Sequence, residues 1–157
     1  MAEGEFALVR QNLESALQKT AAWVGEHDLY AMLADAAAQQ RDEIALRQYA
    51  PLAEETARRY EHKLYQAIAH RAWGAAHHLA GEHAEAEARL QQALELFRGL
   101  DTRWQIGRTL FELGELAQAQ GDAAGARERL TLALAAFEEM KAAPDAARTR
   151  ALLETLR

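Results

Sequence analysis

Residues 74–97 read GAAHHLAGEHAEAEARLQQALELF, and residues 114–137 repeat this stretch as GELAQAQGDAAGARERLTLALAAF. Small and large apolar residues fall at the same places in both copies. A fixed period of about 20–50 residues is the signature of stacked repeats, in which each unit buries its apolar face against its neighbours. The matched residues, each pair 40 positions apart, are Gly74, Gly81, Ala86, Leu90, Ala93, Leu94 and Phe97 with Gly114, Gly121, Ala126, Leu130, Ala133, Leu134 and Phe137.

The repeat continues upstream in a weaker form. Apolar residues also stand 40 and 80 positions before Ala86, Ala93 and Phe97, namely Leu46, Ala53 and Ala57, then Phe6, Leu13 and Leu17. Because a helical repeat is a pair of helices, we expect about eight helices in a single domain over residues 1–157. They would form an incomplete first unit at 5–24, hairpins at 28–59, 62–98 and 102–141, and a capping helix at 144–156.

The composition independently favours helices. Half of the residues are hydrophobic and the chain contains only two prolines. Ala, Leu, Glu, Gln and Arg dominate, and these residues have high helix propensity. A chain of 157 residues is also long enough to bury a substantial core. We therefore expect an all-α fold.

Several residues indicate where the helices begin and end. Gly99 is placed like a helix stop. Thr102 and Gln105 fit a T-x-x-Q capping box that would start the next helix. Asp122 is a natural N-cap, and Pro144 suits the first turn of a helix, where its missing N–H costs nothing.

Charge and motif content argue against several classes of function. The net charge is −6 and the Lys and Arg residues are interspersed with Glu, whereas nucleic-acid binding needs clustered positive charge. No apolar stretch is long enough to span a membrane. The chain has no cysteine, fitting a cytoplasmic protein, and Ser15 is its only serine. No nucleotide-binding or nucleophile motif is present, so we expect neither an enzyme nor a cofactor.

Residues 110–134, LFELGELAQAQGDAAGARERLTLAL, resemble a tetratricopeptide repeat. The resemblance implies a right-handed superhelical solenoid of antiparallel helix hairpins that binds proteins or peptides. The 40-residue period resembles the C-terminal arrays of MalT-like bacterial signalling ATPases and transcription regulators. The residues that carry it are Leu113 and Gly114 on the first helix, Gly121 and Asp122 in the turn, and Ala126, Leu130 and Ala133 on the second helix.

In this family the first helix of each pair lines a concave groove. The resemblance therefore implies that the partner-binding groove contains Asp35, Arg71, Ala75, His78, Arg108, Phe111, Glu115 and Gln118. Among these, Phe111 is expected to be an exposed aromatic anchor beside the Arg71 and Arg108 pair. Our leading hypothesis is a non-catalytic protein or peptide scaffold, and the resemblance implies the sensor or assembly segment of a bacterial signalling regulator as its context.

Two alternatives stay open. The first is a homodimerisation module, in which Phe6, Val9 and Leu13 on the unpaired first helix form an apolar end face. The second is a scaffold that senses a small molecule or a metal through His78 and His83. For the histidines in general we favour half-buried packing positions over metal ligation and expect no metal, because His70 and His77 lie about 10 Å apart along a helix. Trp23, Trp73 and Trp104 are expected to be packing residues.

Overall fold

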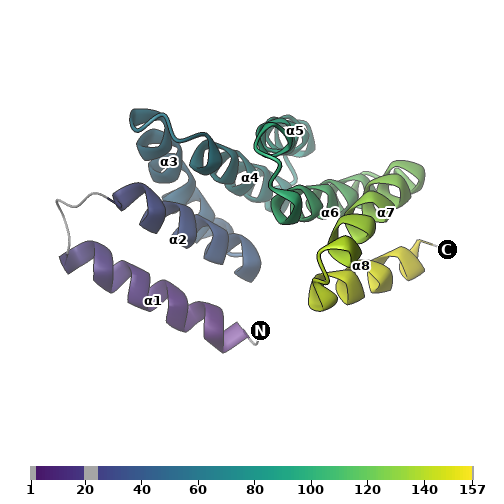
Figure 1. Ribbon diagram of the computed structural model, residues 1–157, viewed down its shortest axis with the longest axis horizontal. Helices are drawn as coiled ribbons and strands as arrows, with labels where there is room; N and C mark the ends of the chain where they lie inside the picture. Colours follow the sequence, from purple (N-terminus) through teal and green to yellow (C-terminus); the bar gives the residue numbers. More distant parts are fainter. Residues whose placement is uncertain (1–2, 20–24, 157) are drawn as a thin grey trace.

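The computed structural model describes residues 3–19 and 25–156 as a series of helices without strands. The helices follow one another from α1 to α8 (Figure 1) and form an all-α solenoid, as predicted. Phe6 lies in α1, but its side chain, like the whole of Trp23, is outside the part that the structure describes. The elements are α1 (Glu3–Lys19), α2 (Glu26–Gln40), α3 (Glu43–Arg59), α4 (Lys63–Leu79), α5 (His83–Gly99), α6 (Arg103–Ala119), α7 (Ala123–Glu139) and α8 (Ala143–Thr155).

The helices are regularly spaced along the chain. Helices α3 to α7 each contain 17 residues, and each begins 20 residues after the one before it. The turns between them repeat at the same interval, and the same turn position always has a positive φ. These positions are Arg41, Glu61, Gly81, Asp101, Gly121 and Lys141, with φ between 50° and 79°.

This spacing corrects one predicted helix end. Gly99, expected to stop its helix, is the last residue of α5, and a Cβ at Gly99 would meet no atom within 4 Å. The left-handed residue of that turn is Asp101. The equivalent position is glycine in only two of the six turns, at Gly81 and Gly121. We therefore attribute the left-handed conformation to the packing of the flanking helices rather than to the residue type.

The predicted helix starts are partly confirmed. Asp122 caps α7 and accepts a 2.9 Å hydrogen bond from the Gly125 amide. Pro144 lies in the first turn of α8. The capping box was wrong, because the Thr102 hydroxyl donates to the Phe97 carbonyl at 3.1 Å.

Glycines bring the two helices of a hairpin into close contact. A Cβ added to Gly74 would lie 2.6 Å from Leu90 Cγ, and one added to Gly114 would lie 2.6 Å from Leu130 Cγ. The same contact therefore recurs 40 residues later. Such a short separation leaves no room for a side chain larger than hydrogen.

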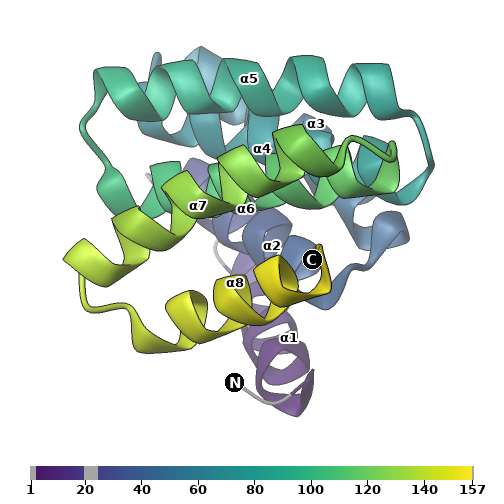
Figure 2. The ribbon, with the colours of Figure 1, turned by 90° about the vertical axis from the view of Figure 1, so that its right-hand side faces the viewer.

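Packing runs along the series rather than around one centre. Consecutive helices contact each other, and in addition α2 packs on α4 and α4 contacts α6. The first helices of the hairpins therefore lie next to one another. Figure 2 looks onto the C-terminal end of the array, where α7 and α8 lie in front of the other helices.

Buried residues form clusters between successive helices. One large cluster joins α2, α3 and α4, and a second joins α5 to α8. Trp73 packs against the first cluster and Trp104 against the second, which confirms that these two are packing residues. Leu13 and Leu17 of α1 cover the N-terminal end of the first cluster.

Candidate functional site

The predicted groove residues come from three adjacent first helices. Asp35 lies on α2, and the others lie on α4 and α6. The structure brings Ala75, His78, Arg108, Phe111 and Glu115 together in the wall of a single pocket. Arg71 and Gln118 are not among the residues that line this pocket. Arg71 is buried, and the Gln118 amide donates to Thr155 Oγ1 at 3.3 Å.

Asp35 holds two buried arginines. Its Oδ1 accepts from Arg71 Nη2 at 2.8 Å and from Arg108 Nη1 at 2.9 Å. Although burial opposes ionisation, the two guanidinium groups lower the pKa of Asp35 below its usual value. Arg71 retains 1% of its exposure and also donates to the Gln105 side chain. Asp35 and Arg71 therefore join α2, α4 and α6, and their charges are satisfied within the protein.

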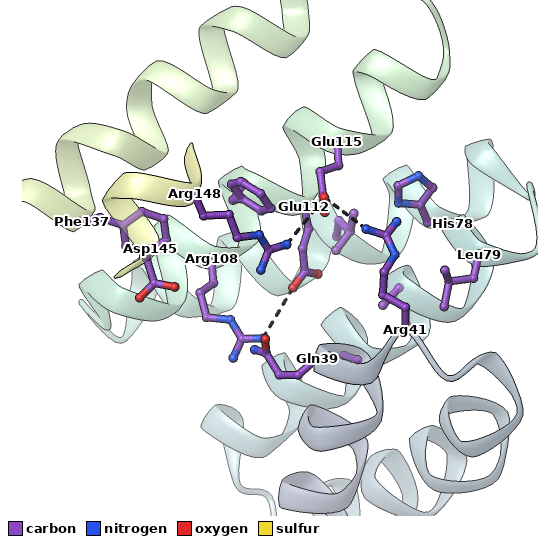
Figure 3. A pocket seen from close by; sticks show the side chains of 14 residues that line it. Gln39, Arg41, His78, Leu79, Arg108, Glu112, Glu115, Phe137, Asp145 and Arg148 are labelled. Carbon is purple, nitrogen blue, oxygen red and sulfur yellow. Dashed lines mark hydrogen bonds and ion pairs between the residues drawn. The ribbon is translucent and has the colours of Figure 1, made fainter. Parts of the chain in front are cut away.

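The pocket has a volume of about 340 Å³ and opens between the first helices (Figure 3). Apolar side chains form part of its wall, including Leu79, Leu90 and Phe137. Charged side chains of both signs form the rest. A concave site with an apolar wall and a few polar groups is the usual form of a binding pocket. The charged and polar lining residues are Gln39, Arg41, His78, Arg108, Glu112, Glu115, Asp145 and Arg148.

Two arginines share one carboxylate at the pocket rim. Arg41 approaches Glu115 to 3.3 Å and Arg148 approaches it to 3.6 Å, from opposite sides (Figure 3). The side chains of Arg41 and Arg148 are 56% and 55% exposed. Because Glu115 balances only one of the two positive charges, this part of the rim offers hydrogen-bond donors to a bound molecule.

The aromatic anchor is less accessible than predicted. Phe111, expected to be exposed, retains only 5% of its exposure. The guanidinium of Arg148 lies 4.2 Å from the centre of its ring, which is a cation–π contact. Phe111 therefore contributes to the pocket wall and supports Arg148 rather than projecting into solvent.

Glu112 is the least satisfied polar residue of the pocket. Its Oε1 lies 3.8 Å from Arg71 Nε and 3.9 Å from Arg108 Nη2, beyond hydrogen-bond distance, and its Oε2 is buried without a partner among the described residues. Burial raises the pKa of Glu112 to about 6, although both arginines oppose the shift. Glu112 is thus a carboxyl group that lacks a donor.

The histidines are half-buried except His62, which is exposed, and most contact polar or aromatic side chains. His70 is hydrogen-bonded to Arg89, and His77 to Glu82, which confirms the predicted packing role. Burial lowers the pKa of His78. Its ring centre lies 6.3 Å from that of His83.

A metal ion held by His78 and His83, the second alternative, would need a third ligand, and Glu82 is the candidate next to His83 in the sequence. Glu82 binds His77 and Arg47 instead of joining these two histidines. Within residues 3–19 and 25–156, no three His, Asp or Glu side chains are arranged to hold a metal ion.

Several pocket residues were missed from the sequence. Arg148 stands 40 positions after Arg108, so the repeat period could have identified it once α8 was recognised as a first helix. Arg41 lies in the turn after α2. The predicted groove contained only residues on helices, so Arg41 was not included. Glu112 and Asp145 carry no sequence signal that separates them from solvent-facing acids.

The predicted dimer face is only partly exposed. Val9 is exposed on α1, whereas Leu13 is half-buried against the first cluster. Arg10 binds Asp42 at 2.6 Å and so attaches α1 to the start of α3. Leu13 therefore supports the fold from the inner side of α1, and self-association remains a prediction.

One comparison with known protein families matches part of the chain. The family model for the tetratricopeptide repeat matches residues 65–139, which cover α4 to α7. No curated protein matches the chain. Among the described helices, none is both long enough and apolar enough to cross a membrane. The match to the tetratricopeptide repeat agrees with the helix hairpins of the fold.

Proposed function

We propose that the chain is a non-catalytic scaffold whose pocket between α2, α4, α6 and α8 binds a segment of a protein partner. Tetratricopeptide repeats generally mediate protein–protein interactions, and residues 65–139 match that family. The observation that carries the proposal is the pocket itself, because side chains from four first helices converge on it. It lies where stacked helix hairpins present a concave binding surface.

The pocket supplies both contact area and orientation. Apolar atoms of Ala75 and Leu79, which are partly exposed, offer a surface for a side chain of the partner. The exposed guanidinium groups of Arg41 and Arg148 offer hydrogen bonds at the rim. A few well-packed anchor residues supply most of the affinity of a protein interface, and a pocket of about 340 Å³ has room for one anchor side chain.

The wider context of this binding is a bacterial signalling regulator in the cytoplasm. The support is the 40-residue period of the hairpins, which resembles the arrays of MalT-like regulators. In such a protein the segment would act as a sensor or assembly module. Its pocket would then bind another part of the signalling complex.

Selection from a random-peptide phage library tests the proposed function. Peptides that bind the chain should bind Arg148→Glu at least about tenfold more weakly, because this change places a negative charge at the rim. The matched control is Arg98→Glu, which reverses an exposed arginine on α5, outside the pocket. Arg98→Glu should leave the affinity unchanged. Equal affinity for wild type and Arg148→Glu would refute the proposal.

A further inference from the structure

One carboxylate oxygen in the pocket is buried without a hydrogen bond. In the described part of the chain, the buried side-chain atoms that lack a partner are His27 Nδ1 and Glu112 Oε2. Of the two residues, only Glu112 lines the pocket. Buried polar atoms in folded proteins nearly always have a hydrogen-bond partner. The exception at Glu112 therefore marks a position in the pocket where an entering hydrogen-bond donor would find an acceptor.

The neighbouring groups do not supply the missing donor. Asp35 binds both Arg108 and Arg71, and Gln105 also binds Arg71. Both arginines therefore approach Glu112 only to 3.8–3.9 Å. At the rim, Arg41 and Arg148 are directed to Glu115 (Figure 3). Since no side chain of the described residues donates to Glu112 Oε2, its donor has to be solvent or a group that enters the pocket.

The charges around the pocket restrict the chemistry of that group. A carboxylate has no hydrogen to donate to Glu112, and a cation would meet four arginines together with acids that already face these arginines. A neutral carboxamide avoids both problems because it carries an NH₂ donor and a carbonyl acceptor. The arginines that would repel a cation are Arg41, Arg71, Arg108 and Arg148.

We propose that the pocket recognises a primary carboxamide, the side chain of an Asn or Gln in the partner protein. Its NH₂ group donates to Glu112 Oε2, and its carbonyl oxygen accepts from a rim guanidinium, Arg41 or Arg148. The methylene groups pack on the apolar wall at Ala75 and Leu79. This inference rests on the proposed function, since it names the side chain that the partner inserts. Glu112 is then the residue that determines specificity.

Titration with small probes tests the chemistry without knowledge of the partner. Propionamide, propylammonium and propionate have nearly the same size and present a carboxamide, a cation and an anion. The readout is the NMR signal of the Ala38 and Ala75 methyl groups, both of which line the pocket. Propionamide should shift these signals in a saturable manner, with a dissociation constant on the order of millimolar. The two charged probes should bind at least about tenfold more weakly.

Variants of Glu112 link the binding to the unpaired oxygen. Glu112→Met has nearly the same length and no strong acceptor, so propionamide binding should weaken about tenfold. Glu112→Gln, which is isosteric and keeps one acceptor oxygen, should show a smaller loss and serves if the Met variant does not fold. The matched control is Glu128→Gln, an exposed acid on α7 outside the pocket, which should leave binding unchanged.

Three outcomes would overturn the inference: tighter binding of propylammonium than of propionamide, equal propionamide binding by wild type and both Glu112 variants, or no shift at Ala38 and Ala75. Failure of the proposed function is distinguishable. If phage-selected peptides depend on Arg148 but propionamide does not bind, the pocket binds proteins through another group. If propionamide does not bind and the peptides bind wild type and Arg148→Glu with equal affinity, both proposals fail.

Discussion

Glu112 illustrates how burial and charge compete at a single residue. Burial raises its pKa to about 6, although two nearby arginines favour the ionised form. Its side chain is 16% exposed, and water solvates it poorly. At neutral pH the folded protein therefore contains a carboxylate whose ionisation costs free energy. The charged groups that face it are Asp35 from α2, Arg71 from α4, and Arg108 and Glu115 from α6.

This cost predicts a pH-dependent effect of Glu112→Gln. A raised pKa means that the protonated carboxyl favours the folded state, and this contribution is lost as the pH rises from about 4.5 to about 6. The loss is about 2 kcal/mol. Because Gln stays neutral, the variant should exceed wild type in free energy of unfolding by about 2 kcal/mol at about pH 7.5 and match it near pH 4.

Urea unfolding of both proteins at the two pH values checks this prediction. Asp35, Asp42 and Glu54, whose pKa values are lowered in the fold, give the opposite pH dependence. They are present in both proteins, so their effect cancels in the difference. A difference between variant and wild type that is independent of pH would show that Glu112 ionises normally.

At the scale of the elements, the turns offer a test of backbone strain. Lys141 adopts φ 56° between α7 and α8, a left-handed conformation that glycine tolerates better than lysine. Lys141→Gly should raise the free energy of unfolding by about 0.5–1 kcal/mol. The reverse change, Gly121→Ala at φ 79°, should lower it by about 1 kcal/mol. Thermal or urea unfolding measures both, and a loss of stability in Lys141→Gly would contradict the argument.

Contact between the two helices of a hairpin predicts a second pair of effects. Gly114→Ala would place a Cβ 2.6 Å from Leu130 Cγ, so we expect a loss of about 1–3 kcal/mol despite the better helix propensity of alanine. Gly99→Ala has no atom within 4 Å of its new Cβ and should gain up to about 1 kcal/mol. Urea unfolding measures both free energies. A Gly114→Ala variant that is more stable than Gly99→Ala would refute the packing argument.

The hairpins were predictable from the sequence, whereas the regular spacing of single helices was not. Matching residues such as Gly74 and Gly114 pack in the same way, and their 40-residue separation was visible in the sequence. The 20-residue interval depends on the turns. Glu61, Asp101 and Lys141 adopt the same backbone conformation as Gly81 but carry no local signal for it. Because the left-handed residue recurs every 20 residues whatever its identity, we attribute its conformation to the packing of the flanking helices.

The candidate site was predictable only in outline. Placing the groove on the first helices was enough to find Arg108 and Glu115. The exposed fraction of each groove side chain could not be derived from its place on a first helix, because that fraction depends on contacts with other helices. Asp35 satisfies Arg108 from 73 residues away, and Arg148 covers Phe111 from the last helix. Such contacts follow from tertiary packing and leave no periodic pattern in one helix.

At the scale of the whole molecule, the Asp35 network connects three successive first helices. Asp35→Ala would leave Arg71 buried without its carboxylate partner on α2. Breaking a buried ion pair from one side costs about 3–5 kcal/mol, and we expect a loss near the lower end because Asp35 remains partly exposed. The control is Glu55→Ala, which removes an exposed pair with Arg59 and should cost less than about 1 kcal/mol. Similar unfolding free energies for the two variants would show that the network does not stabilise the array.

The central claim is that the concave pocket binds a protein segment. The most direct measurement maps a phage-selected peptide onto the chain by the NMR shifts of alanine methyl groups. We predict the largest shifts at Ala38 and Ala75 in the pocket, and none at Ala88 of α5 or Ala135 of α7, which are exposed outside the pocket. Shifts at Ala88 and Ala135 with unchanged signals at Ala38 and Ala75 would contradict the account.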